Sequence, residues 1–152
     1  MLPKRTIWQA FLYAWRGFAH TWRSQPNIRV QFGAAVAVVA AARWLGLNRS
    51  AVVPLLLAIG LVICMEAVNT AVETAVDLAT RDVHPLARLA KDVAAGAVLW
   101  AVVVAVAVGF WIFGPHLGRL PAAVAQRWQQ QPLEVAAAGG VVVLLLASGI
   151  RR

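Results

Sequence analysis

The chain has 152 residues, of which 61% are hydrophobic and 13% are charged, and its formal net charge is +8 at pH 7. A mean hydropathy of +0.72 is too high for a soluble domain of this length and indicates one small integral membrane domain. The positive charge does not indicate nucleic-acid binding, because no basic run carries interleaved aromatic residues. The single cysteine, Cys64, excludes an intrachain disulfide, and we predict that it is a core residue.

The N-terminal segment 6–23 is predicted to form an amphipathic helix at the membrane surface. Aromatic and aliphatic residues recur there at helical spacing beside a separate cationic side. Such a helix suits the headgroup region and is too polar to span a bilayer. It could act only as an anchor, or it could contact the substrate. Pro26 disfavours a helical conformation at Gln25, so a hinge is expected over residues 24–27.

Four apolar stretches follow, and each is predicted to cross the membrane as a helix. The first three cover about 30–47, 51–79 and 92–114, with Ser50 as a candidate N-cap for the second. A polar connector, 115–132, leads to a shorter apolar run over 133–152 that ends in two arginines. The predicted fold is therefore an all-α integral membrane protein, with an interfacial helix, three transmembrane helices and an extra C-terminal transmembrane helix.

The distribution of Lys and Arg predicts the orientation. With the N-terminus inside, ten of these residues lie on the inner side and four on the outer side, which favours a cytoplasmic N-terminus. The inner residues are Lys4, Arg5, Arg16, Arg23, Arg29, Arg81, Arg88, Lys91, Arg151 and Arg152, and the outer ones are Arg43, Arg49, Arg119 and Arg127.

The second span ends in an acidic stripe, which we define as Glu66, Asn69, Glu73 and Asp77. At about 100° per residue these side chains share an arc of roughly 80°. Each ionisable group near the bilayer costs about 2.5–3.5 kcal/mol, so the acidic stripe indicates function. Carboxylate and amide oxygens suit magnesium, a free acid could accept a proton from a hydroxyl, and Lys91 could neutralise phosphate. These residues favour phosphoryl transfer.

Other roles remain open from the residues alone. Glu73 and Asp77 could form ion pairs with Arg81 or Arg88, and Lys91 could be an interfacial anchor. A small transporter or channel subunit could use the acids as an ion relay, but a relay needs acids spread through the depth of the bilayer. An assembly subunit without catalysis would not require them.

Two motifs resemble the signature of the small prokaryotic diacylglycerol kinase and undecaprenol kinase family. They are Glu66-x-x-Asn69-x-x-x-Glu73-x-x-x-Asp77 and His84-Pro85-Leu86-Ala87-x-x-Ala90-Lys91-Asp92, and the similarity covers roughly residues 7–114. The resemblance implies a lipid kinase domain over 1–114 that uses ATP and magnesium, lies in the cell inner membrane and assembles as a homotrimer. The runs 27–30 and 84–87 look more like the undecaprenol branch than the diacylglycerol branch.

The resemblance also implies roles for individual residues. Glu66 matches the catalytic base and Glu73 a magnesium ligand, while the family's other metal-binding acid aligns with Gln25. The hinge could turn Gln25 toward Glu73, but a neutral amide should weaken metal binding. We expect the lipid site to be lined by Glu66, Trp15 and Ala95. The positions that match the nucleotide site are Tyr13, Gln25, Asn69, Glu73, Asp77, Asp82, His84, Lys91 and Asp92.

Overall fold

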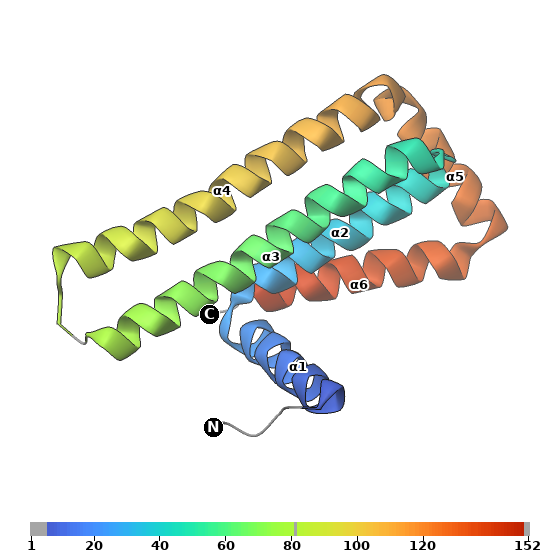
Figure 1. The fold of residues 1–152 in the computed structure, drawn as a ribbon. Helices are drawn as coiled ribbons and strands as arrows, with labels where there is room; N and C mark the ends of the chain where they lie inside the picture. Colours follow the sequence, from blue (N-terminus) through green and yellow to red (C-terminus); the bar gives the residue numbers. More distant parts are fainter. Residues whose placement is uncertain (1–5, 81, 151–152) are drawn as a thin grey trace.

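The computed structural model describes residues 6–80 and 82–150, which form helices joined by short connections (Figure 1). In chain order these helices are α1 (Ile7–Ser24), α2 (Pro26–Trp44), α3 (Arg49–Ala79), α4 (Pro85–Phe113), the 3-10 helix η1 (Gly114–Arg119), α5 (Leu120–Gln130) and α6 (Pro132–Ile150). The predicted all-α class is confirmed. The connector 115–132 is itself largely helical, because η1 and α5 occupy it.

Local chemistry sets the ends of the first two helices. Thr6 and Gln9 form a capping box, in which the Gln9 amide N–H donates to Thr6 Oγ1 at 3.3 Å and the Thr6 amide N–H donates to Gln9 Oε1 at 3.1 Å. Gln25 is extended, and Pro26 occupies the first turn of α2. The predicted hinge between α1 and α2 is confirmed.

The starts of α3 and α4 are capped by side chains. Asn48 Oδ1 accepts a hydrogen bond from the Ala51 amide at 3.0 Å, so Asn48 is the cap of α3 and the prediction of Ser50 is wrong. The turn before it needs a positive φ, which Gly46 supplies at +66°. At α4, His84 Nδ1 accepts from the Leu86 amide at 3.2 Å, ahead of Pro85 in the first turn.

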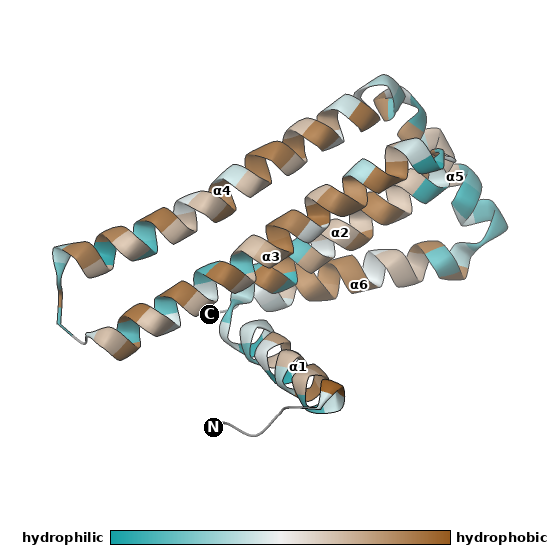
Figure 2. Ribbon diagram, in the orientation of Figure 1, coloured by the Kyte–Doolittle hydropathy of each residue, from teal (hydrophilic) through white to brown (hydrophobic). Residues whose placement is uncertain are grey.

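Four helices lie side by side, with α4 packed on α3, α3 on α2 and α2 on α6, while α1 leaves this bundle at the hinge (Figure 1). The buried hydrophobic core is small and consists of Ile28, Ala42, Leu45, Leu55, Ala58, Val62 and Ala101. Cys64 is exposed on α3, so the prediction that it is a core residue is wrong. Figure 2 shows hydrophobic residues along much of α3 and α4 and hydrophilic residues in α5.

Among the described residues, three helical stretches are long and apolar enough to cross a membrane. They are Arg49–Ala79, the continuous Pro85–Gln130 and Pro132–Ile150. These stretches indicate a multi-pass membrane protein. The 19-residue α2 is not among them because Arg29, Gln31 and Arg43 lower its hydropathy, and its role as a span stays a prediction.

The charges divide along the bundle as the sequence predicts. Arg16, Arg23, Arg29, Arg88 and Lys91 belong to α1, to the first turn of α2 and to the first turns of α4. The four residues expected outside lie near the other end of the bundle, in the last turn of α2, at the start of α3, in η1 and in α5. Lys4, Arg5, Arg81, Arg151 and Arg152 lie outside the described residues. Which end faces the cytoplasm stays a prediction.

Candidate active site

The acidic stripe lies in the C-terminal half of α3, where Glu66 is its most buried member. The Glu66 residue is 2% exposed, and Gln31 of α2 donates from Nε2 to Glu66 Oε2 at 3.3 Å. Within residues 6–80 and 82–150, no salt bridge involves Glu66 or Glu73. A charged group away from water is costly unless it is paired or hydrogen-bonded, so the buried Glu66 carboxylate depends on the Gln31 amide.

Glu73 contacts the hinge. Asn69 Nδ2 donates to Glu73 Oε1 at 2.9 Å, and Gln25 Nε2 donates to Glu73 Oε2 at 3.2 Å. The prediction that the hinge turns Gln25 toward Glu73 is confirmed. Three of the residues predicted for metal and nucleotide binding therefore form one hydrogen-bonded group between the start of α2 and the middle of the acidic stripe.

Two amide oxygens beside these carboxylates are buried and have no hydrogen-bond partner. They are Asn69 Oδ1 and Gln31 Oε1, and in each case the NH₂ of the same side chain donates to a carboxylate of the acidic stripe. Buried polar atoms are normally satisfied, so these two oxygens are available to accept a hydrogen bond or to coordinate a cation. Gln31 was not among the predicted site residues, although it is a lone amide in an apolar stretch of the sequence.

The donor set around Glu73 fits magnesium that keeps most of its ligands from water and phosphate. Glu73 would supply a carboxylate oxygen, and Asn69 and Gln25 would supply amide oxygens once they turn, because both amides now present their nitrogen to Glu73. Within the described part of the chain, no group of three or more His, Cys, Asp and Glu residues could hold a metal alone. A cation at Glu73 would also have to displace the Gln25 N–H that now occupies Oε2.

A polar hollow lies between the end of α3 and the start of α4. Its volume is about 620 Å³, and its lining includes five residues predicted for the nucleotide, namely Asp77, Asp82, His84, Lys91 and Asp92. Lys91 Nζ lies 2.6 Å from Asp77 Oδ1, with side chains that are 38% and 66% exposed. Asp77 thus forms its ion pair with Lys91 and not with Arg88. The Arg88 Nε atom instead lies 3.8 Å from Asp92 Oδ2. Asp77 follows Glu73 by one helical turn, so the hollow adjoins the acidic stripe.

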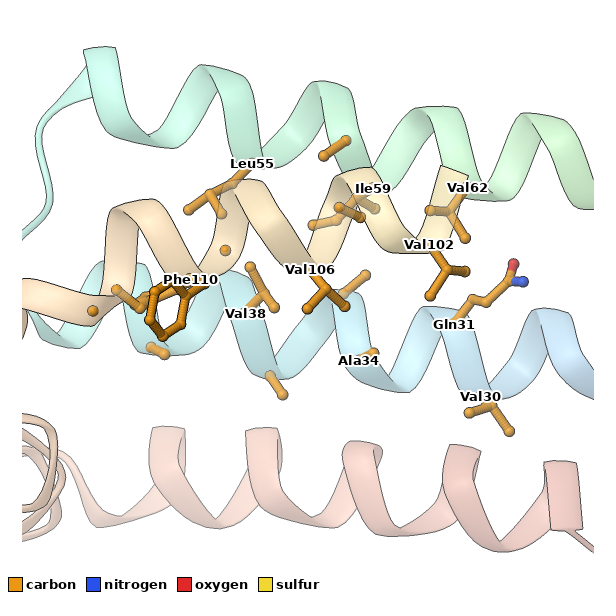
Figure 3. Close-up of a pocket in the computed structure, with 18 of the residues that line it drawn as sticks. Val30, Gln31, Ala34, Val38, Leu55, Ile59, Val62, Val102, Val106 and Phe110 are labelled. Atoms are coloured by element: carbon orange, nitrogen blue, oxygen red, sulfur yellow. The ribbon is translucent and has the colours of Figure 1, made fainter. Parts of the chain in front are cut away.

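An apolar groove of about 830 Å³ lies between α2, α3 and α4 (Figure 3). Gln31 is the polar exception among its lining side chains, and it sits at one end of the groove. Since Gln31 donates to Glu66, the groove ends at the acidic stripe. The structure therefore places Glu66 at the end of the apolar groove, and the hollow that contains Lys91 lies about three helical turns farther along α3.

The remaining predicted residues lie outside these two depressions. Trp15 is exposed on α1, Ala95 is exposed on α4, and neither lines the groove or the hollow. The structure does not bring Trp15 and Ala95 together with Glu66 in one cavity. Tyr13 lies on α1 with the Arg16 guanidinium 5.9 Å from its ring centroid, away from the lining of the hollow.

Comparison with known proteins gives one family and several relatives. A family model described as prokaryotic diacylglycerol kinase matches residues 12–113. A diacylglycerol kinase from Synechocystis sp. is 41% identical over 122 residues, which cover 75% of this chain and 70% of the relative. An undecaprenol kinase from Bacillus subtilis is 38% identical over 111 residues, covering 73% and 90% of the two chains. A diacylglycerol kinase from Escherichia coli K12 is 32% identical over 106 residues, covering 70% and 87%. No solved structure gives a significant match.

Proposed function

Because the chain belongs to the prokaryotic diacylglycerol kinase family, we propose that it transfers the γ-phosphoryl group of ATP to undecaprenol. The family and its named relatives show that the protein is a lipid kinase of the membrane. The proposal rests on the position of Glu66, which is buried where the apolar groove ends. Glu66 also shares its helix face with Asp77, which lines the polar hollow.

In the proposed reaction, Glu66 accepts the proton of the lipid hydroxyl. The hydroxyl oxygen bonds to the γ-phosphorus of ATP, and the bond between the γ-phosphorus and the oxygen that leaves with ADP breaks. Gln31 holds the Glu66 carboxylate through the hydrogen bond at Oε2. Lys91 lies in the hollow, where its ammonium group can face phosphate while Asp77 fixes its position. Magnesium would be held by Glu73, Asn69 and Gln25, and it would neutralise phosphate charge.

The groove supports a lipid with a long apolar chain. Its volume of about 830 Å³ and its almost wholly apolar lining match a hydrocarbon chain whose hydroxyl reaches Gln31 and Glu66. We favour undecaprenol because the runs 27–30 and 84–87 are similar to that branch. Diacylglycerol is the alternative acceptor, supported by the 41% identity to a relative named for it.

The arrangement argues against an ion relay. Glu66, Glu73 and Asp77 all lie in the C-terminal half of α3, and Glu134 lies at the other end of the bundle, in the first turn of α6. A relay would need acids at successive depths between these ends. We also propose that the end with the acidic stripe faces the cytoplasm, where ATP is available, and that the protein forms a homotrimer as the family resemblance implies.

Transfer of radiolabelled phosphate from ATP by the purified protein in mixed micelles tests the function. Undecaprenol and diacylglycerol are compared side by side at saturating ATP and magnesium. Labelled undecaprenyl phosphate formed faster than phosphatidic acid supports the proposal, while the reverse order selects the alternative acceptor. No labelled lipid from either alcohol would contradict the lipid kinase function.

A further inference from the structure

The C-terminal helix α6 lies outside the range that matches the family, yet it packs along α2 (Figure 1). At one end, Glu134 Oε1 accepts from Arg43 Nε at 2.9 Å and from Trp44 Nε1 at 3.3 Å. In the middle, a Cβ added at Gly33 of α2 would lie 3.3 Å from Leu145 Cβ. The two helices are thus in contact over most of their length.

The contact at Gly149, at the far end, is tighter than the contact at Gly33 and involves the first two turns of α2. A Cβ added at Gly149 would lie 3.0 Å from the Pro26 carbonyl oxygen and would overlap the Val30 side chain. In contrast, a Cβ added at Gly139 or Gly140 of the same helix would meet nothing within 4 Å. The absence of a side chain is therefore required at Gly149 for packing, which is the usual reason for glycine at a close helix contact in membranes.

This contact adjoins the residues through which α2 reaches the acidic stripe. Pro26 directly follows Gln25, which donates to Glu73, and Val30 directly precedes Gln31, which donates to Glu66. Figure 3 shows Val30 pointing toward α6 while Gln31 points away from it. The first two turns of α2 therefore contact α6 on one side and the acidic stripe on another.

We propose that α6 is a positioning element for the active site. Through Gly149 it holds the first turns of α2 in place, so that the amides of Gln25 and Gln31 stay on Glu73 and Glu66. The consequence for catalysis rests on the proposed lipid kinase function, whereas the positioning itself does not. Gly149 touches no reacting atom, so it acts through Gln25 and Gln31.

The test compares Gly149→Ala with the matched variant Gly140→Ala, which adds the same methyl group to the same helix in open space. Spin labels on cysteines at Phe11 of α1 and Leu78 of α3 report the position of the hinge, because both residues are exposed. The background carries Cys64→Ala, since Cys64 is exposed and would also be labelled. We expect Gly149→Ala to shift or broaden the distance distribution and Gly140→Ala to leave it unchanged.

A rescue variant shows whether the effect passes through the proposed contact. Val30→Ala removes the methyl group that the new Cβ would overlap, so the double variant should return toward the parent distribution, with Val30→Ala alone as reference. The magnesium concentration for half-maximal kinase activity should rise about tenfold in Gly149→Ala and fall again in the double variant.

An unchanged distance distribution in Gly149→Ala would overturn the positioning role of α6. A change in the distribution that Val30→Ala does not reverse would also overturn it. A reversed distance change without any change in magnesium dependence would overturn the link to the active site. The distance measurement needs no activity, so an inactive parent protein would contradict the kinase function and not the positioning.

Discussion

The Nε2 atom of Gln25 lies 3.2 Å from Oε2 of Glu73 and joins the hinge before α2 to the middle of the acidic stripe. The amide presents a donor to the carboxylate, whereas a metal ligand would present an oxygen. A cation at Glu73 therefore competes with this hydrogen bond, and Gln25 must turn its oxygen inward before it can become a ligand.

The first prediction concerns this pair. Gln25→Glu places two carboxylates within contact distance, and a divalent cation between them relieves their repulsion. We expect the variant to need less magnesium for half-maximal activity, while Gln25→Ala, which offers no ligand, needs more. Magnesium titrations of the kinase rate measure both. If neither variant moves the titration, the metal is held by Glu73 and the ATP phosphates without Gln25.

Glu73→Ala should raise the magnesium requirement more than either Gln25 variant. Glu73 is the one acid in its hydrogen-bonded group, so its loss removes the protein's main charge on the ion. Glu134→Gln, at the other end of the bundle, is the control for loss of a negative charge, because its amide oxygen can still accept from Arg43 and Trp44. A titration curve for Glu73→Ala that overlays the parent curve would remove Glu73 from the metal site.

Gln31→Leu tests the support of Glu66. The substitution keeps the apolar character of the groove but leaves the buried Glu66 carboxylate without its donor. We expect the free energy of unfolding to fall by about 1–3 kcal/mol, because a buried acceptor has lost its partner. Chemical unfolding in detergent measures this. Val38→Leu is the control, because it changes the same groove without altering a polar group. An equal fall in the free energy of unfolding in both variants would show that packing alone is responsible.

Lys91→Met separates nucleotide binding from stability. The Lys91–Asp77 pair is largely exposed, so it contributes only about 0–1 kcal/mol to stability and the melting temperature should hardly change. The KM for ATP should rise, since a cation leaves the hollow expected to hold phosphate. Arg119→Met removes an exposed cation at the other end and should leave this KM unchanged. Equal KM values for the two variants would contradict nucleotide binding at the hollow.

Much of the fold could be predicted because its signals are local. Pro26 sets the hinge through its effect on Gln25, and the 3.6-residue period places the acidic stripe on one face of α3. The expectation that Gln25 faces Glu73 combined these two features with the metal-binding position that the family resemblance implies for Gln25. The cap at Asn48 was missed because three adjacent polar residues, 48–50, offered more than one start for the helix.

The parts that could not be predicted depend on which helices become neighbours. The link from Gln31 to Glu66, the exposure of Cys64 and the packing of Gly149 on α2 are set by the order of helices in the bundle. The apolar groove could not be predicted either, because it is formed by faces of α2, α3 and α4 that no local pattern brings together. The lipid site at Glu66, Trp15 and Ala95 stays a prediction.

The central claim is that Glu66 is the base that accepts the proton of the lipid hydroxyl, and Glu66→Gln tests it most directly. The amide keeps the size of the side chain and can still bond to Gln31, but it cannot accept the proton. We predict that phosphate transfer to undecaprenol falls by about 10²-fold or more while ATP binding and the melting temperature stay close to the parent values. Turnover equal to that of the parent protein would contradict the assignment of Glu66 as the base.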